Sequence, residues 1–160
     1  REFRRVLFRS ICKRPGGAAA AMLNGSGGHA GLFADARDLA VIMQMLLQKG
    51  YYGGHQYIRP ETVVQFTTRH PKSTRRGIGF DMLEQDNKKE PNLSLLASEQ
   101  SFGHTGFTGT SAWADPVHDL VFIFLSNRTY PSMENSILAK QNFRPRLQSI
   151  VYKALMTPEV

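Results

Sequence analysis

The segment that most constrains the fold is the apolar run at residues 120–126, which reads Leu-Val-Phe-Ile-Phe-Leu-Ser. A run of this kind, with no polar alternation, is typical of a strand that is buried on both faces of a sheet. Strand-like segments precede it at 101–106 and 110–115, and the turn residues of 116–119 predict a hairpin into the apolar run. We therefore expect an antiparallel sheet with residues 120–126 as a central strand.

Residues 35–50 predict an amphipathic helix. Asp35 suits the N-cap position, Asp38 falls in the first turn, and Gly50 suits the position just beyond the helix. The apolar side chains of this segment recur at helical spacing and form one stripe. The stripe consists of Leu39, Ile42, Met43, Leu46 and Leu47.

Two further helices are predicted to open at prolines, which fit the first turn of a helix. A short one begins at Pro60 and a C-terminal one at Pro145. The apolar stripe of the second consists of Leu147, Ile150, Val151, Ala154 and Leu155.

Residues 77–83 alternate between apolar and polar side chains, with Ile78, Phe80 and Met82 opposite Asp81. This pattern predicts a half-buried strand with Asp81 on the solvent side. Residues 84–98 are polar and contain Pro91, which predicts a surface loop. The order of elements indicates an α+β fold, in which helices flank an antiparallel sheet.

The net charge of +7 is concentrated at the start of the chain. Residues 1–14 carry six basic side chains and one acidic, and residues 15–160 are nearly balanced. We expect residues 1–14 to be a basic tail outside the fold and residues 15–160 to form the domain. A nucleic-acid partner is not expected, because a binding domain would carry its positive charge on a face. No apolar run is long enough for a membrane span.

Cys12 is the single cysteine, so a cysteine-cluster zinc site and an internal disulfide are excluded. His118 could form a metal cluster with Asp115 and Asp119, but all three flank a predicted turn, which favours such residues for structural reasons. We expect no metal and no cofactor.

Glycine is unusually frequent in two segments. Residues 15–31 read as a loop, and Gly28, His29 and Gly31 could line a site ahead of the first helix. In residues 102–110, Gly103, Gly106 and Gly109 surround a histidine and hydroxyl side chains. Amides at an open strand edge could stabilise an oxyanion. A bulge followed by a tight turn explains the same glycines equally well.

Two stretches, Gly-His-Thr-Gly-Phe-Thr-Gly-Thr-Ser-Ala-Trp-Ala-Asp-Pro and Leu-Val-Phe-Ile-Phe-Leu-Ser-Asn-Arg-Thr-Tyr-Pro, resemble the serine β-lactamase-related hydrolases. This superfamily includes class C β-lactamases, penicillin-binding DD-peptidases and esterases. His104, Thr105 and Gly106 match its third motif, Lys/His-Thr/Ser-Gly. The resemblance covers about residues 22–156 and implies the C-terminal part of a β-lactamase/transpeptidase-like fold.

The resemblance also implies roles for the motif residues. His104 would replace the usual lysine beside the substrate, Thr105 would bond a polar group of the substrate, and the Phe107 N–H would be one of two oxyanion donors. Gly106 and Gly109 would keep the strand open to the ligand.

The family nucleophile belongs to a Ser-x-x-Lys motif at a helix start. Ser10 and Lys13 match this pattern, but Arg-Pro-Gly-Gly follows at once and a helix cannot tolerate it, so we reject Ser10 as the nucleophile. The family's Tyr-x-Asn or Ser-x-Asn motif does not occur. The resemblance therefore implies a fragment that lacks the nucleophile and whose partner is the N-terminal half of the same domain.

A narrower resemblance rests on Arg-Arg-Gly-Ile-Gly-Phe-Asp-Met and on the C-terminal Arg-Pro-Arg-Leu-Gln-Ser-Ile-Val-Tyr-Lys-Ala-Leu. Both are similar to β-lactamase-like domains fused behind family 3 glycoside hydrolases in bacterial envelope proteins. It implies a periplasmic or cell-envelope location. Two functions follow as hypotheses. The first is a serine hydrolase fragment for peptide, β-lactam or ester substrates, inactive in isolation, and the second is a non-catalytic module that binds peptidoglycan peptides.

Overall fold

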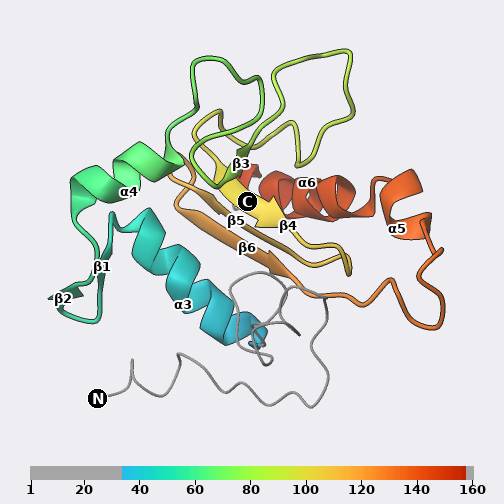
Figure 1. Cartoon of the computed structure of the whole chain (residues 1–160), viewed down its shortest axis with the longest axis horizontal. Coiled ribbons are helices and arrows are strands. Elements are labelled where there is room, and N and C mark those ends of the chain that lie inside the picture. Colours follow the sequence, from blue (N-terminus) through green and yellow to red (C-terminus); the bar gives the residue numbers. More distant parts are fainter. Residues whose placement is uncertain (1–33, 158–160) are drawn as a thin grey trace, which may run out of the picture. The chain divides into compact units, whose positions relative to one another are not determined.

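A computed structural model of the chain describes residues 34–157 of the 160. The chain divides into two compact units, Arg1–Leu39 and Ala40–Val160, and the sheet lies in the second. Figure 1 shows the elements, which in chain order are α3 (Ala36–Leu47), β1 (Tyr51–Tyr52), β2 (His55–Gln56), α4 (Pro60–Thr67), β3 (Asp81–Met82), β4 (Phe102–Thr105), β5 (Ser111–Asp115), β6 (Leu120–Phe124), α5 (Ile137–Lys140) and α6 (Phe143–Met156). None of the helices in residues 34–157 combines the length and the hydropathy needed to cross a bilayer.

The main sheet has the strand order β3-β4-β5-β6, and each neighbouring pair is antiparallel. The hairpin between β5 and β6 turns at residues 116–119, as predicted, with Asp119 in a left-handed conformation at φ 49°. The prediction of an α+β fold with an antiparallel sheet flanked by helices is confirmed.

The apolar strand β6 does not occupy the central position predicted for it. Among the described residues it pairs only with β5 and ends the sheet, and all five of its side chains are partly exposed. Both faces of β6 still contribute to packing. Phe122 contacts the core cluster around Trp113, and Ile123 contacts the cluster around Ala114 on the other face of the sheet. A continuous apolar run shows that a strand packs on both faces, but it does not show where the strand lies in the order.

The alternation of side chains along the strands divides the core into two clusters. Trp113 of β5 packs with Tyr152 of α6 and with Leu93, while the next residue, Ala114, packs with Met43 of α3. The Ala40–Leu47 part of α3 therefore covers one face of the sheet and α6 the other (Figure 1). Burial of each large side chain contributes roughly 1.5–3 kcal/mol. The stripe predicted for α3 reaches its cluster at Met43, Leu46 and Leu47.

The ends of α3 follow the predicted signals with one shift. Asp35 Oδ1 accepts a hydrogen bond from the Asp38 N–H at 2.9 Å, which confirms the N-cap. At the other end the Gly50 N–H donates to the Met45 carbonyl at 2.8 Å, one bond of a Schellman motif. Lys49, at φ 53°, takes the left-handed position that the sequence predicted for Gly50, and Gly50 follows at φ 87°.

The strand predicted at 77–83 is much shorter. Met82 is buried as the alternation predicts, but Asp81, on the opposite face, is buried as well. Only Asp81–Met82 pairs as β3, Ile78 is exposed, and Asp81 has no exposed surface. Burial of Asp81 is possible because Arg75 and Arg76 bring their guanidinium groups to its carboxylate.

The loop at residues 84–98 was predicted to lie on the surface, and this is also wrong in part. Leu93 and Ala97 belong to the core, and the buried Ser94 N–H donates to Gln148 Oε1 of α6 at 3.0 Å. The loop therefore supplies core contacts between the sheet and α6.

Helix α6 buries a different face from the predicted one. It begins at Phe143, two residues before Pro145, and its buried residues are Gln148 and Tyr152. Ile150 of the predicted stripe is 64% exposed and Leu155 is 56% exposed. Gln148 is polar and Tyr152 lies outside the predicted stripe, so the hydrophobicity pattern did not identify this face.

The carboxylate of Asp115 is the centre of a buried polar network. It accepts hydrogen bonds from the Ser98 N–H and hydroxyl at 2.9 and 2.6 Å, from the Tyr152 hydroxyl at 2.7 Å and from His118 Nδ1 at 2.9 Å. No group of metal-ligating side chains is found in residues 34–157. The hydrogen bond between His118 Nδ1 and Asp115 gives this pair a structural role within the turn.

Candidate functional site

The His-Thr-Gly motif lies where the edge of β4 is open. All four β4 residues pair with β5, but β3 pairs only with Phe102 and Gly103. The outer edge of β4 is therefore uncovered at His104 and Thr105 within the described residues. The two side chains alternate to opposite faces of the sheet, as neighbouring strand residues do.

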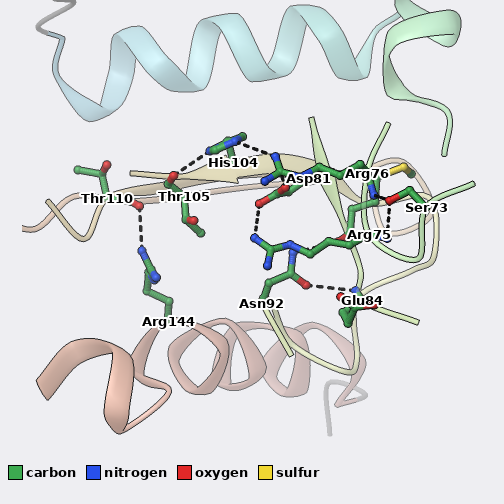
Figure 2. Close-up of polar contacts among 11 residues, drawn as sticks. Ser73, Arg75, Arg76, Asp81, Glu84, Asn92, His104, Thr105, Thr110 and Arg144 are labelled. Carbon is green, nitrogen blue, oxygen red and sulfur yellow. Dashed lines mark hydrogen bonds and ion pairs between the residues drawn. The ribbon is translucent and has the colours of Figure 1, made fainter. Parts of the chain in front are cut away.

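His104 is exposed, and both of its ring nitrogens have partners. Nδ1 lies 2.8 Å from the Thr105 carbonyl oxygen, and Nε2 lies 3.3 Å from Arg76 Nη1 (Figure 2). A carbonyl oxygen only accepts and a guanidinium only donates. The geometry therefore fits a neutral imidazole with its proton on Nδ1.

Arg76 is in turn held by the buried carboxylate of Asp81. Arg76 Nη1 lies 2.6 Å from Asp81 Oδ1, and Arg75 Nη2 lies 2.6 Å from Asp81 Oδ2 (Figure 2). Two guanidinium groups share one carboxylate, so this cluster keeps one positive charge beside His104.

On the other face of the sheet, the edge of β4 borders a polar cleft of about 230 Å³. Arg144 reaches into this region from α6 and donates to the Thr110 carbonyl at 3.4 Å (Figure 2). Burial and the positive charges of Arg128 and Arg75 lower the pKa of Arg144. Guanidinium groups gathered in this way favour a bound anion. The polar residues of the lining are Arg75, Glu90, Asn92, Thr105, Asn142 and Arg144.

The turn after β4 presents an amide that has no acceptor among residues 34–157. The Gly106 N–H donates to the Thr110 carbonyl at 2.8 Å, whereas no hydrogen bond from the Phe107 N–H occurs within residues 34–157. Arg128 fixes this turn, because its Nε donates to the Phe107 carbonyl at 2.7 Å and its guanidinium lies 4.4 Å from the centre of the Phe107 ring. The amide predicted as an oxyanion donor is therefore available in a constrained turn.

Packing within the sheet accounts for the three glycines of this segment. A Cβ at Gly103 would lie 2.7 Å from the Trp113 ring, and one at Gly106 would collide with the Thr110 hydroxyl. Gly109 is buried at φ 102°. The bulge-and-turn interpretation thus explains the glycines, while the open edge and the free amide lie beside them.

Several candidate residues fall outside the described part of the chain. They are Ser10, Gly28, His29 and Gly31. A larger cleft of about 590 Å³ lies between α4 and the end of α3, and none of the motif residues lines it.

Sequence reasoning missed the arginines of the site. No site role was predicted for any of the four. The segments that contain them showed only the family resemblance or were predicted as loop or helix; they are Arg75, Arg76, Arg128 and Arg144. A usable signal was the arginine pair five and six residues before Asp81 in a strand-like segment. It was overlooked because the alternation placed Asp81 on the solvent side.

An antiparallel sheet between helices, with a His-Thr-Gly segment on an open strand edge, defines a chain of the serine β-lactamase-related type. The family model described as Beta-lactamase matches residues 9–143, so the chain belongs to this family. The predicted superfamily is confirmed.

Known relatives agree with this assignment. The chain is 40% identical over 113 residues to proteins named "Putative D-alanyl-D-alanine carboxypeptidase" from Salmonella gallinarum and Salmonella newport, which covers 71% of the chain. It spans 26% of the length of these relatives. A β-lactamase from Mycobacterium bovis has a similar fold, with a TM-score of 0.56 and 19% identity over 78% of this chain and 45% of that one.

Proposed function

We propose that this chain forms the oxyanion and substrate-binding wall of a serine hydrolase of the DD-carboxypeptidase type. The observation that carries the proposal is the edge of β4, which is open within the described residues. There the Phe107 amide, which has no acceptor among those residues, lies two positions after Thr105, and Thr105 borders a cleft that Arg144 also lines. The 40% identity to proteins named as D-alanyl-D-alanine carboxypeptidases supports the same class of substrate.

The cleft suits a peptide that ends in a carboxylate. Arg75 is already paired with Asp81, so the positive charge for a carboxylate comes from Arg144, which has no ion pair among the described residues. Thr105 supplies a hydroxyl on the same side of the sheet. Hydrogen bonds from ionised groups to a carboxylate contribute about 1.5–3 kcal/mol each. The terminal carboxylate would place the preceding amide or ester carbonyl toward the Phe107 N–H.

In the reaction, the carbonyl oxygen gains negative charge when a serine attacks the carbonyl carbon and an acyl-enzyme forms. The Phe107 N–H is suited to stabilise that charge as one of two donors. The attacking serine and its base would come from the N-terminal half of the same domain, which is the partner this proposal requires.

A non-catalytic module that binds peptidoglycan peptides is the second candidate. It is favoured by one observation, namely that both ring nitrogens of His104 are engaged. The motif then supplies groups that can bind a ligand, but neither ring nitrogen of His104 is left to accept a proton from a substrate. The cleft would serve this function equally well.

Binding of N-acetyl-D-alanyl-D-alanine, followed by the backbone amide signals of the 160-residue chain, tests the proposed substrate class. The peptide acid should shift the signals of Thr105 and Phe107, and the matched C-terminal amide should bind more weakly. Arg144→Met should weaken binding of the acid about tenfold or more, and Arg146→Met, on an exposed position of the same helix, should not. Equal affinity for acid and amide, or no shift at β4, would refute the proposal.

A second assay tests whether this chain has hydrolase activity of its own. The isolated chain should not turn over a chromogenic ester or cephalosporin. Turnover that Ser10→Ala abolishes would show that the chain carries its own nucleophile.

The proposed setting is the bacterial cell envelope, where D-alanyl-D-alanine peptides occur. Attachment to a family 3 glycoside hydrolase remains a prediction from the sequence alone.

A further inference from the structure

A continuous series of polar contacts runs from the core of the sheet to the open edge of β4. It begins at Asp81, which is completely buried, passes through Arg76 to His104 Nε2, and ends where His104 Nδ1 meets the Thr105 carbonyl (Figure 2). The first three residues come from two segments that are 23 residues apart in the sequence.

The donor and acceptor types of these groups allow only one arrangement of protons. Arg76 cannot accept a hydrogen bond and the Thr105 carbonyl cannot donate one. Consequently Nε2 must hold a lone pair toward Arg76, and Nδ1 must hold the proton toward Thr105. Rotation of the ring by half a turn about its Cβ–Cγ bond would break both contacts.

The series depends on how Arg76 is anchored. The Arg76 side chain is 53% exposed, and an arginine with that exposure usually samples many rotamers. Here its Nη1 lies 2.6 Å from Asp81 Oδ1 and 3.3 Å from His104 Nε2. Arg75 contacts the other oxygen, Asp81 Oδ2, so the two guanidinium groups bind separate atoms of the carboxylate.

We propose that Arg76 is a positioning residue that fixes the tautomer and orientation of His104 from its anchor on Asp81. The ring is thereby held with Nε2 toward Arg76 and Nδ1 toward the Thr105 carbonyl, and the fixed positive charge at this position belongs to the guanidinium. The consequence for the substrate rests on the proposed function, because it requires that the substrate binds along the open edge of β4, where His104 lies. The assignment of the tautomer does not require this.

Nitrogen NMR of the histidine rings in the 160-residue chain tests the proposal directly. The wild-type chain should show His104 as the Nδ1–H tautomer. Arg76→Met keeps the length of the side chain and removes its donors and its charge, and should lower the ratio of Nδ1–H to Nε2–H tautomers about three- to tenfold. Arg76→Lys restores a donor and should recover most of the original ratio.

Arg75→Met is the matched control, since it removes the other guanidinium from Asp81 but no contact to His104. It should leave the His104 ratio unchanged. The proposal is overturned if Arg76→Met leaves the ratio unchanged, or if Arg75→Met lowers it equally. Because no ligand is present in this measurement, its failure is distinguishable from a failure of the proposed function, which would appear as missing peptide binding in a chain with the expected tautomer.

Discussion

Tyr152→Phe removes one hydrogen bond from the buried network at Asp115 and keeps the aromatic ring that packs in the core. Tyr152 is 1% exposed and Asp115 is 2% exposed, and the bond between the Tyr152 hydroxyl and Asp115 Oδ2 measures 2.7 Å. A hydrogen bond to an ionised group contributes about 1.5–3 kcal/mol. The carboxylate keeps its bonds from Ser98 and His118, so we expect a loss of about 1.5–3 kcal/mol in the free energy of unfolding at pH 7.

The difference between wild type and variant should depend on pH in a defined direction. Burial and the hydrogen bond to Asp115 raise the pKa of Tyr152 above its ordinary value near 10. A raised pKa in the folded state stabilises the fold below the pKa of the unfolded chain, and this stability is lost as the pH rises above it. At pH 11 the wild type should therefore lose about 1.4 kcal/mol that the phenylalanine variant does not lose.

Urea unfolding of both proteins at pH 7 and pH 11 measures these quantities. The destabilisation caused by Tyr152→Phe should be present at pH 7 and smaller at pH 11 by about 1.4 kcal/mol. Other lysine and tyrosine side chains titrate equally in both proteins, so their effects cancel. A difference below about 0.5 kcal/mol at pH 7, or one that does not change with pH, would refute this account of the network.

Two further substitutions test the packing of the sheet and the exposed face of α6. Gly103→Ala should lower the free energy of unfolding by about 1–3 kcal/mol or more, because its Cβ would lie 2.7 Å from the Trp113 ring, and a loss below about 0.5 kcal/mol in urea unfolding would contradict this packing. Ile150→Lys should change the free energy of unfolding by less than about 0.5 kcal/mol in the same urea experiment, since Ile150 is 64% exposed; a large loss of stability would show that this face is covered.

Local chemistry in the sequence predicted much of the fold. Turn residues at 116–119 and the N-cap at Asp35 depend on neighbours within a few positions, and both are where the pattern indicated. Helix α4 likewise begins at Pro60. These signals are strong because they need no knowledge of distant contacts.

The errors arose where a specific polar partner, close by or distant in the sequence, allows a polar group to be buried. Asp81 is buried because two arginines neutralise it, and Gln148 because it bonds to Ser94 in a distant loop. Hydrophobic periodicity assigns such residues to the surface. The same limit applies to the site: the motif residues His104 and Thr105 were found from the sequence, whereas Arg75 and Arg76 were overlooked because the alternation placed Asp81 on the solvent side.

Hydrogen exchange at two neighbouring amides tests most directly whether the edge after β4 is an open site for a ligand. In the free chain the Phe107 amide should exchange rapidly, since it has no acceptor in residues 34–157, and the Gly106 amide should exchange slowly because it donates to the Thr110 carbonyl. Saturating N-acetyl-D-alanyl-D-alanine should slow exchange at Phe107 and leave Gly106 unchanged. A Phe107 amide that is already protected in the free chain, or that the bound peptide does not protect, would contradict the account.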